Sequence, residues 1–233
     1  AMTNGKIPEH DATAWSRGRW SSVTLNPVLF SLKEDLKNVS AFEENNGLLE
    51  VEAEAFHYNS NNESPRKWYL RSEAHAAPFS NVTNHTASAS GKAYIEALPD
   101  TRVTHGDDLI QGENFFPVPG TGGIVSYKVN INNPGTYYVW VKAYSSGPED
   151  NGLHVGVDGN WPESGQRIQL CKGKNAWTWS SAQRVPENHC GVPQTITLHF
   201  EKAGEHIISF SMREDGFELD KWLLAQDKNY IPE

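Results

Sequence analysis

Alternating apolar and polar residues recur along most of this chain and predict β-strands separated by turns. A typical turn is Asn133-Pro134-Gly135, between two alternating segments. Helical periodicity is almost absent after residue 47. The predicted strands are 48–56, 67–71, 93–98, 123–131, 136–144, 153–159, 166–170, 194–201, 204–212 and 218–225. Many short strands with Gly and Pro turns predict an all-β fold, an antiparallel β-sandwich with Greek-key connections.

Residues 1–47 differ from the rest. They are rich in Ser and Asn and contain one weakly helical segment, 31–36. We therefore expect an N-terminal extension or linker over residues 1–47 and one β-sandwich domain over residues 48–233. A sandwich of this length has ample material for a hydrophobic core.

The charge balance is acidic, with 20 Lys and Arg against 29 Asp and Glu and a net charge of −9. Nucleic-acid binding requires clustered basic residues, so we expect no nucleic-acid partner. No apolar segment is long enough to span a bilayer, and we expect no membrane association. The chain starts Ala1-Met2, which is typical of a cloning remnant, so we expect a signal peptide to have been removed. A secreted or extracellular monomer fits these features.

Two cysteines, Cys171 and Cys190, flank a segment rich in Trp, Lys and Asn. A disulfide here suits an oxidising compartment and would stabilise the fold by about 3 kcal/mol through chain entropy. The alternative is two buried free thiols. Two cysteines without a closely spaced His pair are too few for a structural zinc site.

Acidic residues alternate on the first and last predicted strands, as Glu52 and Glu54 near one end of the chain and Asp220 near the other. Carboxylate oxygens are the ligands that Ca²⁺ prefers. If the two strands lie side by side, these acids could share one ion. The alternative is that they are ordinary solvent-facing positions.

Three sequence segments together resemble the carbohydrate-binding modules of families 6 and 35. They are Glu52-Ala53-Glu54, the strand pair 127–144 around its Pro-Gly turn, and Phe217-Glu218-Leu219-Asp220. The resemblance covers roughly residues 48–227. It implies a galactose-binding-like jelly-roll sandwich and a structural Ca²⁺ held by Glu52, Glu54 and Asp220, with backbone carbonyls completing the site.

The resemblance also implies a sugar site at the loop end of the sandwich. Sugar rings stack on aromatic faces, and this chain has 8 Trp and 8 Tyr. The family's stacking positions correspond to Tyr94 and to Trp177 and Trp179, with Trp177 the better platform. Asp150 and Asn151 lie where the family has a small-residue loop beside the sugar.

The closing strand departs from the family pattern. Family 6 modules usually have an Asn before the closing Leu-Asp, whereas this chain has Glu218, which would bind a diol but repel an anion. Arg213, a few residues earlier, could bind an oxygen-rich or charged sugar. A salt bridge with Glu214 or Asp215 is the alternative for this arginine.

These features predict a non-catalytic module that binds polysaccharide and targets an attached catalytic domain to it. A red-algal galactan such as agarose is the first candidate ligand, and xylan or another neutral β-glycan is the alternative. A second hypothesis is a lyase or glycoside hydrolase on the same fold, since paired carboxylates can cleave glycosidic bonds. The nine His are scattered and form no catalytic motif, which favours the binding module.

Overall fold

The computed structural model describes residues 27–80 and 82–233. The chain forms two compact units, Ala1–Lys37 and Asn38–Glu233. In the first unit, helix α2 (Pro27–Asp35) overlaps the predicted helical segment; residues 1–26 of the predicted extension lie outside the described residues. Residues 38–47, which we assigned to the extension, fall in the second unit, where β1 pairs with β6. The division into extension and binding domain stays a prediction.

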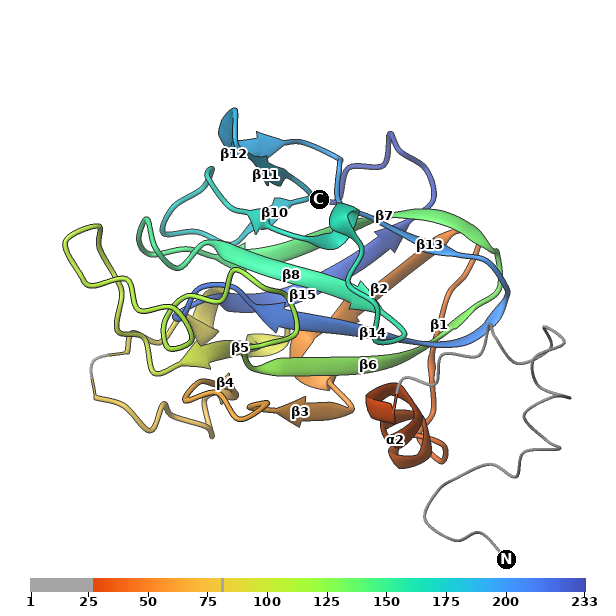
Figure 1. The fold of residues 1–233 in the computed structure, drawn as a ribbon, viewed down its shortest axis with the longest axis horizontal. Coiled ribbons are helices and arrows are strands. Elements are labelled where there is room, and N and C mark those ends of the chain that lie inside the picture. Colours follow the sequence, from red (N-terminus) through yellow and green to blue (C-terminus); the bar gives the residue numbers. More distant parts are fainter. Residues whose placement is uncertain (1–26, 81) are drawn as a thin grey trace, which may run out of the picture. The chain divides into compact units, whose positions relative to one another are not determined.

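The second unit is a sandwich of two β-sheets (Figure 1). Sheet A has the strand order β1 (Phe42–Glu43), β6 (Ile124–Ile131), β14 (Gly204–Met212), β8 (Gly152–Val157), β9 (Ile168–Gln169), β11 (Gln183–Val185), β12 (Asn188–Val192), with β3 (Tyr58–Ser60) also paired to β6. The short parallel pair of β1 and β6 departs from the antiparallel pattern. The other pairings of this sheet are antiparallel.

Sheet B is antiparallel throughout its named pairings. Its strand order is β10 (Thr178–Ser180), β7 (Gly135–Tyr144), β15 (Glu218–Ala225), β5 (Ala93–Leu98), β4 (Lys67–Ser72), with β13 (Thr197–Phe200) paired to β7 and β2 (Leu48–Glu52) paired to β15. The last strand is therefore central, with β7, β5 and β2 as its partners. The predicted all-β sandwich is confirmed.

Four short 3-10 turns interrupt the strands: Ala53–Ala55, Thr86–Ser88, Ser90–Lys92 and Glu163–Gly165. The first of them corrects one predicted strand, because β2 ends at Glu52 and Glu54 lies in the turn. The hydroxyl of Tyr127 in sheet A donates a 2.6 Å hydrogen bond to the carbonyl of Ala53, which fixes this turn against the core.

The inward faces of the two sheets form one hydrophobic core. Trp222 from sheet B lies at its centre, with its ring 5.0 Å from that of Tyr127 and 5.6 Å from that of Phe210. Trp140 is also buried, but it packs with Leu223 on the opposite, outer face of sheet B.

The outer face of sheet B carries a row of polar and aromatic side chains. Glu218 lies opposite both Glu96 and Tyr144, and Tyr94 lies opposite Arg71. Side chains directly opposite one another in an antiparallel sheet point to the same face. Residues between them along the strands, such as Ile95 and Leu219, belong to the core. The strand register therefore gathers chemistry-bearing side chains on one surface.

No helix among the described residues has the length and apolarity that crossing a membrane requires.

Candidate functional site

An aromatic cluster lies on the outer face of sheet B. The ring of Trp177 meets those of Tyr94 and Tyr144 edge to face, at centroid distances of 5.2 and 5.4 Å. On Tyr144, the imidazole of His85 stacks at 3.8 Å. Trp177 precedes β10, which is paired with β7 and so places the indole beside Tyr144. The predicted pair Tyr94 and Trp177 is brought together, and the structure adds Tyr144 and His85.

Two carboxylates lie beside these rings. Glu218 accepts hydrogen bonds from His85 Nδ1 at 2.8 and 2.9 Å, and Glu96 forms a buried ion pair with Arg71. Burial raises the pKa of Glu218, and burial together with the charge of Glu218 raises the pKa of Glu96. Arg71 and His85 oppose these shifts by favouring the ionised carboxylates.

Residues 82–92, here called the cover segment, lie over this face. The backbone N–H of His85 donates to the Tyr94 hydroxyl at 3.3 Å, and the Thr83 carbonyl accepts from Arg71 at 3.5 Å. Tyr94 has no exposed surface, and Glu96 and Glu218 are 3% and 4% exposed. A ligand therefore cannot reach these three residues unless the cover segment moves.

Trp177 differs from the two tyrosines of the cluster, since it is only half-buried. Its indole Nε1 is shielded from solvent and has no hydrogen-bond partner among the described residues. A buried donor without a partner is uncommon and is often satisfied by water or a ligand. A partly exposed ring backed by two tyrosines can stack on the flat face of a sugar.

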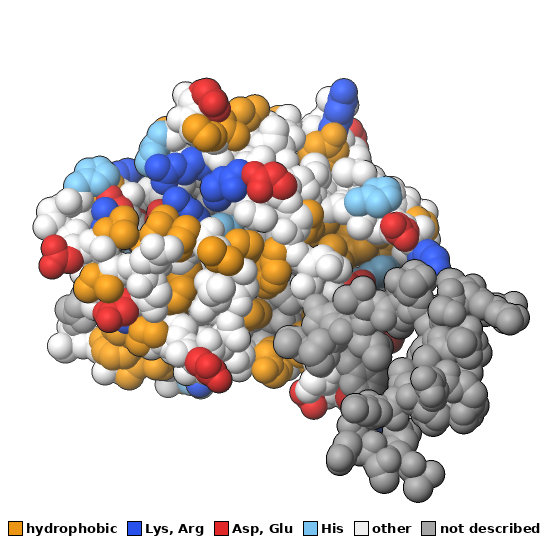
Figure 2. Space-filling model, viewed as in Figure 1, with side chains coloured by type: hydrophobic (Ala, Val, Ile, Leu, Met, Phe, Trp, Pro, Cys, Tyr) orange, Lys and Arg blue, Asp and Glu red, His pale blue; other side chains and the backbone are white. Residues whose placement is uncertain are grey.

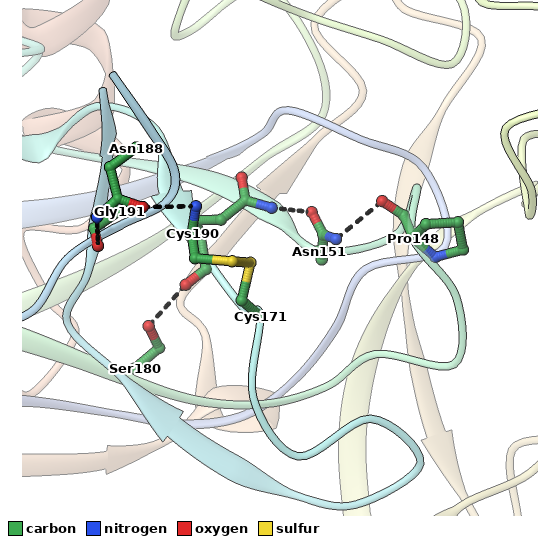
Figure 3. The surroundings of a disulfide bond; sticks show 8 residues. Pro148, Asn151, Cys171, Ser180, Asn188, Cys190 and Gly191 are labelled. Atoms are coloured by element: carbon green, nitrogen blue, oxygen red, sulfur yellow. Dashed lines mark hydrogen bonds between the residues drawn. A yellow bond between two sulfur atoms is a disulfide. The ribbon is translucent and has the colours of Figure 1, made fainter. Parts of the chain in front are cut away.

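The predicted residues Asp150 and Asn151 have internal partners. The Asp150 carboxylate accepts hydrogen bonds from Ser145, Ser146 and Gly147 and so closes its own loop. Asn151 donates to the Pro148 carbonyl at 2.8 Å (Figure 3). Both side chains are buried. The structure gives them a loop-shaping role, and their contact with sugar stays a prediction.

Arg213 is paired with Glu214, and its guanidinium lies 4.8 Å from the centre of the Phe115 ring. Arg213 is only 5% exposed. The alternative that we gave for this arginine, a salt bridge with its neighbour, is what the structure contains, and it is buried. Asp215 turns elsewhere and accepts hydrogen bonds from Arg66 and Thr101.

Trp179 belongs to a separate aromatic cluster with Trp140, Leu223 and Ala225. It borders a groove of about 270 Å³ whose wall includes the Cys171–Cys190 disulfide. The predicted disulfide is confirmed (Figure 3). Trp177 and Trp179, although two residues apart, thus belong to two different clusters on the outer face of sheet B.

The three predicted metal ligands lie close together. β2 and β15 pair with Lys221 opposite Glu52, so the first and last predicted strands are adjacent as the calcium hypothesis requires. A register shift between Leu219 and Lys221 places Asp220 at an irregularity of β15. There Asp220 accepts from the Ser90 N–H at 2.9 Å, and Glu52 accepts from the Ser90 hydroxyl at 2.8 Å.

The carboxylates retain acceptor capacity for a cation. Glu52 Oε2 and Glu54 Oε2 are buried and have no hydrogen-bond partner within residues 27–80 and 82–233. Burial, together with the charges of Glu52 and Asp220, raises the pKa of Glu54 to about 6. Asp220 Oδ2 lies 3.1 Å from Lys142 Nζ. No three His, Cys, Asp or Glu of the described ranges form a ready metal-binding group. Carboxylate oxygens are nevertheless the donors that a hard cation such as Ca²⁺ prefers, and backbone oxygens would have to complete such a site.

Sequence reasoning did not identify His85, Tyr144, Arg71 and Glu96. The last three follow from register, because pairing β4, β5, β15 and β7 puts them on the face of Tyr94 and Glu218. His85 lies in a polar segment without periodicity, and no sequence signal marks its contact with Glu218.

A sequence model of the glycosyl hydrolase family 115 C-terminal domain matches residues 41–230. The chain belongs to this family. Its sequence is also 53% identical over 212 residues to an uncharacterized protein of Formosa agariphila, a match that covers 89% of this chain and 51% of that protein. The chain thus spans about half the length of this curated relative.

Solved carbohydrate-binding modules are among the similar structures. A family 35 module from Clostridium thermocellum is 14% identical, with a TM-score of 0.41, and the match covers 76% of this chain and 96% of that one. The C-terminal family 6 module of a marine laminarinase from Zobellia galactanivorans is 15% identical, with a TM-score of 0.37, covering 77% and 99%. These are the two families that the sequence resembles. A glycosyl hydrolase C-terminal domain has a carbohydrate-related function.

Proposed function

We propose that this family 115 C-terminal domain is a non-catalytic module that binds polysaccharide and holds an attached catalytic domain on it. The single observation that carries the proposal is the partly exposed Trp177 ring, backed by Tyr94 and Tyr144. Weak binding by a few stacked rings raises the effective concentration of the attached enzyme at its substrate. A red-algal galactan such as agarose is the first polymer proposed, and xylan the second.

The test is affinity electrophoresis through gels that contain agarose, carrageenan, xylan or β-glucan. We expect at least one polymer to retard the parent chain and Trp177→Ala to abolish most of that retardation, with little change in melting temperature. Trp179→Ala is the matched control, since it removes the same side chain from the other aromatic cluster. Loss of retardation in Trp179→Ala alone would place the site at the disulfide groove and contradict the role of Trp177.

Catalysis is the second candidate, favoured by one observation. Glu96 and Glu218 lie opposite each other on neighbouring strands and both have raised pKa values, as acid and base pairs in glycosidases often do. Both are buried and engaged by Arg71 and His85, which argues for a structural role. Reducing-sugar and unsaturated-product assays decide between the two: product release that Glu218→Gln abolishes would establish an enzyme.

We further propose that Ca²⁺ stabilises the domain at Glu52, Glu54 and Asp220. The ion would link the turn after β2 to the irregularity of β15 and balance three neighbouring carboxylates. Added Ca²⁺ should raise the melting temperature and a chelator should lower it. Asp220→Asn should remove both responses. A parent protein whose melting temperature ignores both reagents would refute the calcium site and leave the binding proposal intact.

A further inference from the structure

A second surface of the sandwich carries concentrated positive charge. An open groove of about 700 Å³ lies at the β11 and β12 end of sheet A, and we call it the cationic groove. In Figure 2, blue Lys and Arg side chains gather on the upper part of the viewed face, with pale blue His and red acidic side chains at their border. The groove is lined by Glu163, Arg167, Arg184, Val185, Pro186 and His189.

Arg167 is held rigidly in this groove. Its guanidinium pairs with Glu163 and donates from Nε to the Arg184 carbonyl at 3.1 Å. Its backbone has a φ of +57°, a conformation that is uncommon for a residue with a side chain and often occurs at functional sites. The backbone N–H of Arg167 donates to Nδ1 of buried His154, which keeps that backbone in place. The arginine is thus positioned in advance of any ligand.

Arg184 has no acidic partner. Its backbone N–H and carbonyl bond to Arg167, but within the described residues its guanidinium has no ion pair. The side chain is half-buried, so its charge is partly desolvated at the groove wall. Charges in such positions interact more strongly with an incoming anion than fully hydrated ones do.

His189 lies on the same wall and is exposed. It precedes Cys190, whose disulfide to Cys171 anchors this part of β12. Partial desolvation and the positive charges of Arg184 and Arg213 lower the pKa of the His189 imidazole. Glu163 offsets Arg167, and Glu214 offsets Arg213 nearby. One uncompensated guanidinium remains at the groove, on a protein whose net charge is −9.

We propose that the cationic groove binds the oxyanion groups of an acidic polysaccharide, either sugar carboxylates or sulfate esters, through Arg184, Arg167 and His189. The inference rests on the proposed function for the nature of the polymer, but it concerns a separate surface from Trp177. Guanidinium groups bind carboxylate and sulfate oxygens with two parallel hydrogen bonds.

The experiment compares polymers that differ in charge. Agarose and carrageenan are galactans without and with sulfate, and unsubstituted xylan and glucuronoxylan are xylans without and with carboxylate. Affinity electrophoresis of the full chain should show stronger retardation by the charged member of at least one pair, and that excess should fall as NaCl is raised. The pair that shows the excess identifies the oxyanion.

Arg184→Gln and His189→Gln test the groove directly. We expect Arg184→Gln to weaken binding to the charged polymer about tenfold, as loss of one charge-assisted contact predicts, and to leave binding to its neutral counterpart within about twofold. Lys228→Gln is the control, because it removes one charge from an exposed position elsewhere. His189→Gln should give a smaller loss in the same direction. Unchanged melting temperatures would establish that the variants are folded.

The outcomes separate the two proposals. Equal weakening by Arg184→Gln and Lys228→Gln would mean that only net charge matters and would overturn the groove. Retardation that is the same for charged and neutral polymers and that depends on Trp177 alone would also overturn the proposal for the cationic groove. It would support the proposed function. If none of the polymers retards the parent chain, both proposals fail.

Discussion

Two surfaces of this domain use arginine in opposite ways. On the outer face of sheet B, Arg71 is 1% exposed, paired with Glu96 and covered by residues 82–92. In the cationic groove, Arg184 is half-buried, open to ligand and without an acidic partner in the described ranges. A charge that is paired with a carboxylate inside the protein contributes to the stability of the fold, whereas one without an acidic partner at a groove can bind a ligand. Stability and binding should therefore respond to different variants.

The largest effect should come from breaking the buried pair. Glu96→Gln leaves the Arg71 guanidinium buried without its carboxylate and should cost about 3–5 kcal/mol in the free energy of unfolding, measured by urea denaturation. Arg184→Gln should change that free energy by less than about 0.5 kcal/mol. If Glu96→Gln cost as little as Arg184→Gln, the contrast between the two surfaces would be wrong.

Removing the disulfide should lower the stability of the domain and weaken polymer binding at the cationic groove. Cys171→Ser with Cys190→Ser opens a 19-residue separation and should lower the free energy of unfolding by about 3 kcal/mol. Because His189 is next to Cys190, retention by a charged polymer should also decrease. Trp177-dependent retention by a neutral polymer serves as the internal control. Equal losses on charged and neutral polymers would indicate general loosening of the fold.

Acid should lower the stability of the domain through protonation of His154, the residue that accepts a hydrogen bond from the backbone of Arg167. Burial lowers the pKa of His154 to about 4, against an ordinary value of 6.5. Nδ1 accepts the Arg167 N–H, and Nε2 lies 3.1 Å from the Phe116 carbonyl, so the folded state holds the neutral imidazole.

Between these two pKa values the unfolded chain binds a proton that the folded chain excludes. Stability is therefore lost as pH falls from 6.5 to 4, by about 2–3 kcal/mol. His154→Gln, whose amide can make the same two bonds, should lack this part of the pH dependence. Parallel stability curves for parent and variant over that range would contradict the assignment.

The smallest effect concerns the cover segment. His85→Ala removes a stacked ring from Tyr144 and a hydrogen bond to Glu218, and should lower the free energy of unfolding by about 1–2 kcal/mol. It should also increase solvent access to the face of sheet B, measured as faster amide exchange of β5. Unchanged exchange would mean that other residues of the segment hold it closed.

The sequence predicts the long strands of this fold well and its site only in part. Strands 93–98 and 218–225 occur as predicted, because core residues alternate along them with residues of the outer face, although both faces are buried. Short strands such as β11 and β12 carry too few residues for a pattern. The adjacency of Glu52 and Asp220 follows from strand pairing, which the resemblance anticipated.

Side-chain partners are harder to predict than strands. Nothing in the order of residues shows that Asp150 binds its own loop, since this depends on loop conformation. The cationic groove was equally hidden, because Arg167 and Arg184 meet only through the β9 and β11 pairing. The composition of the chain does not indicate this groove either, because the net charge of the whole chain is negative.

The central place of β15 in sheet B has a consequence for biosynthesis. Its partners β2, β5 and β7 are all synthesised earlier. β15 follows the end of β7 by more than 70 residues, so it leaves the ribosome well after them. Until then these partners have unpaired edges, which are prone to wrong pairing. Sheet B should therefore form late during translation, and a truncation before residue 218 should yield an aggregating chain and not a smaller folded domain.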